Sequence, residues 1–179
     1  MGNILKKATH SAFSWETMGD IEQGRGGLGV EMPVVVYRLM QYTLLDVLTA
    51  AYGLEKANEH FRRAGFLAGE QFAKHTLNLD EPDLNAFLKD LQEKLKEMKI
   101  GILRLESIDP QTGEMVLTVG EDLDCSGLPI TNENVCMYDE GFISGILHAY
   151  TGVTHDVREV DCWASGDRVC RFRASRSES

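Results

Sequence analysis

The fold of this chain is indicated most directly by residues 159–170, which read EVDCWASGDRVC. Short apolar stretches lie on both sides of Ser-Gly-Asp at residues 165–167, a pattern typical of two antiparallel strands joined by a tight turn. We therefore predict a hairpin with strands at 157–164 and 168–174. In that register Cys162 faces Cys170, and facing residues have Cβ atoms about 4.5–5.5 Å apart, which suits two thiolates on one metal ion.

Three of the four cysteines and one carboxylate can converge at this hairpin: Cys136, Glu159, Cys162 and Cys170. Three thiolates and one oxygen form a plausible closed zinc site, because Zn²⁺ favours four such donors in a tetrahedron. Glu159 would point away from Cys162 on a straight strand, so a β-bulge must lie between them if both bind one ion. Cys125, in the preceding loop, is either a free buried thiol or a substitute fourth ligand. Spacing alone also allows all of these cysteines to be small buried hydrophobes.

Composition and charge narrow the class of protein. A chain of 179 residues suits one domain with a substantial core. Its net charge of −10 argues against nucleic acid or an anionic membrane as a partner. The chain has no run of about 18 apolar residues, and its first residues lack the apolar stretch of a signal peptide. We therefore expect a cytoplasmic protein, in which cysteines serve as metal ligands or redox groups rather than in structural disulfides.

The remaining pattern predicts an α+β fold with helices packed on an antiparallel sheet. The chain reads as an N-terminal arm (1–24), a single domain (25–174) and a frayed tail (175–179). Within the domain, apolar periodicity and turn residues predict helices at 34–52, 55–76, 83–98 and 134–150, and a first hairpin at 100–108 and 114–121.

Two details of these helices carry further expectations. The helix at 34–52 is apolar on most sides, so it should be buried or line a cavity. Gly65 and Gly69 share one face of the next helix, where the absence of side chains lets another backbone approach closely. A glycine-rich stretch at 24–29 matches the pattern G-x-G-x-x-G, but no convincing strand precedes it, so it is interpreted as a loop rather than a nucleotide site.

Several segments together resemble the 4-vinyl reductase domain family, especially the aromatic-sensing domains of phenol- and xylene-responsive bacterial activators. They are CMYDEGFISG at 136–145, REVDC at 158–162, Gly166 and CRF at 170–172, with a looser match at 28–40. The resemblance covers about residues 25–174. It implies a structural zinc held by Cys136, Glu159, Cys162 and Cys170. It also implies a ligand-binding fold, often dimeric, that is similar to the core subunits of trafficking complexes.

We therefore expect a small-molecule binding or sensory module for a hydrophobic or aromatic ligand, stabilised by structural zinc and forming a homodimer. No catalytic residues are expected, because no Ser–His–Asp or Cys–His order stands out. Two alternatives remain: a reductase or accessory subunit in tetrapyrrole vinyl reduction, and a thiol redox switch through Cys162 and Cys170. The candidate ligand-lining residues are Tyr37, Met40, Leu44, Phe61, Phe66, Phe72 and Phe142.

Overall fold

The computed structural model describes residues 13–177. The predicted arm at 1–24 and tail at 175–179 therefore lie partly outside the described residues. Two compact units divide the chain after Val30, whereas the sequence placed the boundary after residue 24.

The first unit contains a 3-10 helix, η1 (Trp15–Met18), and the short helix α1 (Ile21–Gly24). The side chain of Asp20 caps α1 by accepting a hydrogen bond of 2.9 Å from the Gln23 amide. The glycine-rich stretch begins at the last residue of α1 and continues as a turn. In residues 13–30 no strand precedes it, as the sequence predicted, so it lacks the setting of a nucleotide-binding loop.

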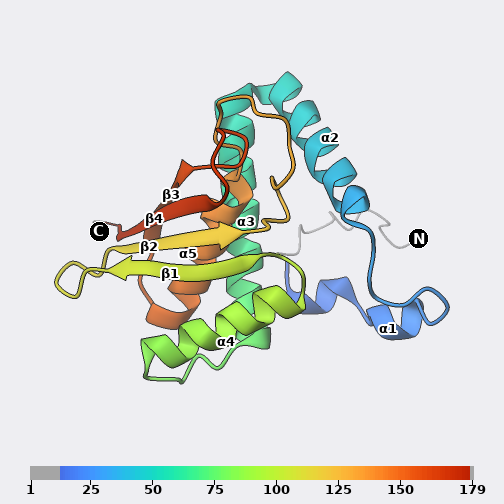
Figure 1. Ribbon diagram of the computed structural model, residues 1–179. Helices are drawn as coiled ribbons and strands as arrows, with labels where there is room; N and C mark the ends of the chain where they lie inside the picture. Colours follow the sequence, from blue (N-terminus) through green and yellow to red (C-terminus); the bar gives the residue numbers. More distant parts are fainter. Residues whose placement is uncertain (1–12, 178–179) are drawn as a thin grey trace, which may run out of the picture. The chain divides into compact units, whose positions relative to one another are not determined.

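The second unit is α+β, which confirms the predicted fold class (Figure 1). In residues 31–177 the sheet has four strands in the order β1-β2-β4-β3, and all neighbours are antiparallel. The elements are α2 (Val34–Tyr52), α3 (Leu54–Thr76), α4 (Leu84–Glu97), β1 (Ile102–Ile108), β2 (Met115–Gly120), α5 (Met137–Thr151), β3 (His155–Asp161) and β4 (Cys170–Arg176).

The two faces of the sheet differ because side chains alternate along each strand. On one face Met115, Leu117 and Phe172 are buried, and α4 and α5 pack there. The other face carries ion pairs, with Arg171 Nε 2.8 Å from Glu106 Oε2. The core of the domain therefore lies between the sheet and the helices, with α3 packed against α5.

The last hairpin confirms the predicted register and bulge. Asp161 faces Arg171, the same register that places Cys162 opposite Cys170. The register shifts between Glu159 and Asp161, so Glu159 and Cys162 are both buried although they are three residues apart. The strands are shorter at the turn than predicted, and residues 162–169 form a longer connection. At its other end β4 continues to Arg176, two residues past the predicted end of the domain.

Helices α3 and α5 touch backbone to backbone, which confirms the role predicted for Gly65 and Gly69. A Cβ atom at Gly65 would lie 2.0 Å from the carbonyl oxygen of Tyr138, and one at Gly69 would lie 2.0 Å from that of Phe142. The contact is reciprocal, because a Cβ atom at Gly141 would lie 1.9 Å from the Arg62 carbonyl oxygen. Only glycine fits at these crossing points.

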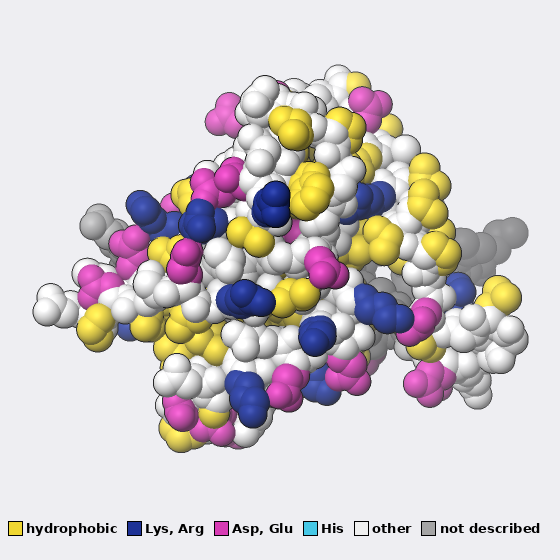
Figure 2. Space-filling view, in the orientation of Figure 1, with side chains coloured by type: hydrophobic (Ala, Val, Ile, Leu, Met, Phe, Trp, Pro, Cys, Tyr) yellow, Lys and Arg dark blue, Asp and Glu magenta, His cyan; other side chains and the backbone are white. Residues whose placement is uncertain are grey.

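Helix α2 differs from its expectation, because it is largely exposed. Within α2, all of which the structure describes, Gln41 is the one buried residue, while Val35, Leu39 and Val47 are 60%, 61% and 62% exposed. Figure 2 shows hydrophobic side chains gathered along this helix. By length and composition alone α2 could cross a membrane, contrary to the sequence expectation. Its Tyr and Arg side chains nevertheless bind the domain, as shown below.

The α3–α5 contact predicts a large cost for the smallest side chain. We expect Gly141→Ala to destabilise the protein by about 3 kcal/mol, because the new methyl group must push the two helix backbones apart. Urea unfolding followed by circular dichroism measures this change. Gly24→Ala is the matched control, since a Cβ atom there has nothing within 4 Å. Equal stability of the two variants would contradict the close approach.

Candidate functional site

Four cysteine side chains meet at one end of the sheet. Cys125 lies in the loop after β2, Cys136 immediately precedes α5, Cys162 follows β3, and Cys170 begins β4. All four are free thiols, at most 1% exposed, and their sulfur atoms lie within 4.8 Å of one another. Segments distant in the sequence are therefore joined at one point.

The spacing of the sulfur atoms fits a tetrahedral metal site. The Sγ of Cys136 is 3.8 Å from the Sγ atoms of Cys162 and Cys170. A tetrahedron with zinc–sulfur bonds of about 2.3 Å has edges of about 3.8 Å. The Cys125 and Cys170 sulfurs are closer, at 3.0 Å. The cluster could therefore hold a metal ion with small adjustments of one side chain.

Proximity of the thiols also affects their ionisation. Hydrogen bonds from the three other thiols lower the pKa of Cys162, while contacts with its neighbours raise the pKa of Cys136 and of Cys170. Without a cation, this buried cluster therefore favours a single thiolate. A metal ion would replace the protons, because metal ligands must be deprotonated.

Glu159 lies beside the cysteine cluster. Its Oε2 accepts a hydrogen bond of 3.0 Å from the backbone amide of Cys136. Its Oε1 is buried and has no hydrogen-bond partner among the described residues. Burial raises the pKa of Glu159 to about 8. The sequence predicted Glu159 as the fourth metal ligand, and the structure brings a fourth sulfur, that of Cys125, into the compact group.

Glu140 supports this arrangement from inside the domain. Its side chain is 4% exposed, and its Oε1 accepts a hydrogen bond of 2.8 Å from the Glu159 amide. Its Oε2 forms an ion pair with Arg62 Nε of α3, and Arg158 Nη1 lies 3.7 Å away. One buried carboxylate thus ties α3, α5 and β3 together where the β3 bulge begins. Sequence reasoning missed this residue, which has no distinguishing pattern on an apolar helix.

Three acidic side chains lie next to the cysteines. Burial raises the pKa of Asp124 to about 7 and also raises the pKa values of Asp122 and Asp139, and the neighbouring carboxylates of Asp122 and Asp124 raise that of Asp139 further. These residues were also missed from the sequence. The available signal was Asp-x-Asp-Cys directly after a strand.

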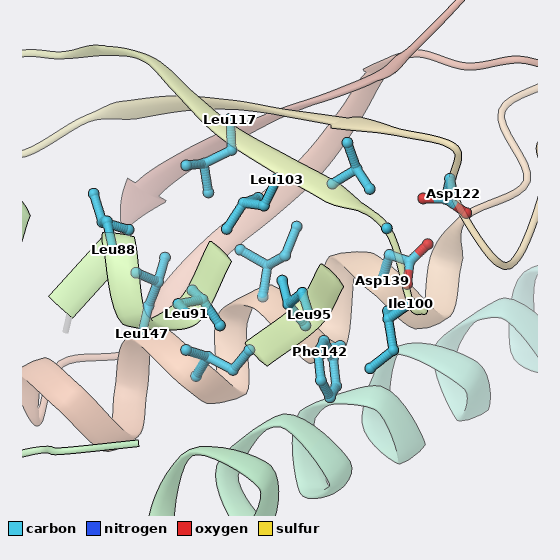
Figure 3. A pocket seen from close by; sticks show the side chains of 14 residues that line it. Leu88, Leu91, Leu95, Ile100, Leu103, Leu117, Asp122, Asp139, Phe142 and Leu147 are labelled. Atoms are coloured by element: carbon cyan, nitrogen blue, oxygen red, sulfur yellow. The ribbon is translucent and has the colours of Figure 1, made fainter. Parts of the chain in front are cut away.

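Asp122 and Asp139 close one end of an enclosed apolar cavity between α4, α5 and the sheet (Figure 3). Leucines from α4, β1 and β2 and Phe142 line the rest of it. Its volume of about 30 Å³ holds about two water molecules. In this conformation the cavity is too small for an organic ligand.

A larger apolar groove lies between α2 and α3. Its volume is about 300 Å³, and it is open to solvent on one side. Four of the predicted ligand-lining residues are there, namely Tyr37, Met40, Leu44 and Phe61, together with Gln41, Leu48, His60, Ala64 and Tyr138. Gln41 is 6% exposed, and its Oε1 has no hydrogen-bond partner among the described residues.

The other three predicted lining residues lie elsewhere. Phe142 lines the enclosed cavity and packs against Phe72, with ring centroids 5.3 Å apart. Phe66 packs against His148 at 5.5 Å. Phe66 and Phe72 line neither the groove nor the cavity.

One wall of the groove is attached to the cysteine loop. Side chains of α2 donate four hydrogen bonds to residues 123–126, on both sides of Cys125: Tyr37 to Asp124 Oδ1 (2.7 Å), Arg38 to the carbonyl oxygens of Leu123 and Ser126 (2.9 Å each), and Tyr42 to the Asp124 carbonyl oxygen (2.9 Å). These contacts explain why an apolar, exposed helix stays on the domain.

Comparison with known proteins agrees with this geometry. The family model of the vinyl-4-reductase domain matches residues 115–176, from β2 to the end of β4. An uncharacterised protein of Methanocaldococcus jannaschii, MJ0150, is 26% identical over 145 residues, which are 81% of this chain and 76% of that protein.

Solved structures share the fold. The phenol-responsive sensory domain of the transcription activator PoxR, solved with phenol, is similar with a TM-score of 0.61 and 16% identity, over 82% of this chain and 76% of that one. A vinyl-4-reductase family protein from Methanocaldococcus jannaschii has values of 0.59 and 15%, over 84% and 85%. A trafficking protein particle complex subunit 3 from Naegleria fowleri, covalently bound to palmitic acid, has values of 0.62 and 13%, over 81% and 95%.

Proposed function

We propose that this chain, whose residues 115–176 are a vinyl-4-reductase domain, is a binding module for a hydrophobic small molecule, stabilised by a structural zinc ion. The observation that carries the proposal is the apolar groove of about 300 Å³ between α2 and α3. This volume lies at the lower end of the range found for small-molecule sites. The net charge of −10 further supports a neutral ligand over nucleic acid.

The groove also indicates which ligands would bind. Phe61 and Tyr138 offer aromatic surface, and the unpaired Gln41 Oε1 offers one buried acceptor. A molecule with an apolar body and one hydroxyl or N–H donor would satisfy both. Proteins of the same fold were solved with phenol or palmitic acid, which supports a hydrophobic ligand here.

We propose that zinc binds at the cysteine cluster through Cys136, Cys162 and Cys170, with Glu159 or Cys125 as the fourth ligand. Four protein ligands leave no position for a reactive water, so the ion would be structural. It would join the start of α5 to the last hairpin. Free thiols only 3.0 Å apart are compatible with the reducing cytoplasm that we propose as the location.

We also propose that the protein is a homodimer, with α2 packed against a second copy. Val35, Leu39 and Val47 form an exposed apolar face of α2 that is larger than isolated surface hydrophobics require. A two-fold axis would bury the same apolar stripe of both copies at once.

The zinc site predicts one zinc ion per chain in native mass spectra of freshly purified protein. We expect Cys162→Ala to lose the ion and about 4 kcal/mol of stability when free zinc exceeds its Kd about 1,000-fold. Val160→Ala, at an exposed position of the same strand, should keep both. A wild-type protein that is metal-free and fully folded would refute the site.

The groove predicts that Ala64→Trp abolishes binding of 1-naphthol, because the indole would fill the space, whereas Leu67→Trp on the exposed surface of α3 should leave it unchanged. Gln41→Leu should weaken 1-naphthol binding about fivefold and leave naphthalene binding unchanged, since only 1-naphthol donates a hydrogen bond. Fluorescence titration measures both. Loss of binding in Leu91→Phe, which fills the enclosed cavity, with binding retained in Ala64→Trp, would overturn the assignment to the groove.

The dimer predicts a mass of two chains in size-exclusion chromatography with light scattering. We expect Leu39→Glu combined with Val47→Glu to give folded monomers, because two buried charges would face their copies across the axis. Ile130→Glu, at another exposed apolar position, should remain dimeric. A monomeric wild-type protein at micromolar concentration would contradict this interface.

A further inference from the structure

The loop that carries Cys125 faces two sites at once. On one side, the Cys125 sulfur lies in the cysteine cluster, 3.0 Å from that of Cys170. On the other side, the residues adjacent to Cys125 accept the four hydrogen bonds from α2. We infer that Cys125 is the fourth metal ligand and that the metal, through this loop, holds α2 in place as one wall of the groove. This inference rests on the proposed zinc site and ligand groove.

The local structure holds Cys125 ready for this role. Asp122 Oδ1 accepts hydrogen bonds from the amides of Asp124 (2.7 Å) and Cys125 (3.2 Å), which forms a tight turn directly after β2. Cys125 is fully buried, and its sulfur completes a group of four within 4.8 Å. Four sulfurs are a common structural zinc set.

Glu159 is the competing donor, and its contacts assign it a different role. One of its oxygens already accepts the Cys136 amide at 3.0 Å. Its own amide is held by Glu140 at 2.8 Å. Glu159 therefore positions Cys136, as residues around a metal site commonly orient the ligands themselves.

The attachment of α2 then depends on the metal. All four hydrogen bonds from α2 described above end on residues 123–126. If the metal leaves, Cys125 loses its bond to the cluster and this short loop loses its anchor. Helix α2 then loses its fixed acceptors, and the groove between α2 and α3 loses a wall. Metal occupancy would thereby control ligand binding without any ligand contact to the metal.

Cobalt substitution tests the ligand assignment, because the intensity of sulfur-to-cobalt charge-transfer absorption rises with the number of thiolate ligands. We expect Cys125→Ser to lower this intensity by about a quarter, from four thiolates to three. Glu159→Gln should leave it unchanged. The reverse pattern, with Cys125→Ser unchanged, would overturn the assignment. A wild-type protein that binds no Co²⁺ or Zn²⁺ would instead refute the zinc site itself.

Hydrogen exchange tests the link to α2. We expect amides of residues 34–52 in the zinc-loaded protein to exchange about tenfold faster after chelation and in Cys125→Ser, while α3 and α5 stay protected. Glu159→Gln with zinc should keep α2 protected. Wild-type and Cys125→Ser proteins should exchange equally without metal. Unchanged exchange of α2 on chelation, or a difference between the two metal-free proteins, would overturn the coupling and leave zinc binding and the groove standing.

Discussion

The direct contact between the backbones of α3 and α5 is the constraint on which the rest of the domain depends. Glycines on both helices allow a distance that any side chain would forbid. This contact sets the depth of α5, whose first turn carries Glu140 and follows Cys136. It also places Tyr138 where it can close the groove between α2 and α3. The metal cluster and the groove are therefore both built on one helix crossing.

Much of this architecture could be predicted from local pattern. Helix α2 has the bounds expected from its initial proline and final glycine, and the paired glycines of α3 correctly indicated a close backbone contact. The awkward spacing of Glu159 and Cys162 correctly required a bulge. These features could be predicted because each depends on periodicity or on conformational limits within a few residues.

Other features depend on contacts between distant segments, which no local pattern encodes. The periodicity of α2 indicated a buried helix, but its polar side chains bind the loop after β2 and leave its apolar residues exposed. The buried Glu140 and the acidic residues beside Cys125 acquire their roles only when three segments meet. Predicted aromatic lining residues such as Phe66 and Phe72 instead pack within the core.

The four hydrogen bonds from α2 to one short loop have a consequence for how such a domain can evolve. Most of the groove residues on α2 do not belong to the compact core, which lies between the sheet, α4 and α5. Substitutions such as those at Met40 or Leu44 would reshape the groove at little cost in folding stability, provided that Tyr37, Arg38 and Tyr42 keep their partners. Ligand preference and thermodynamic robustness are thus carried by separate parts of the chain, so homologues can diverge in what they bind while conserving how they fold.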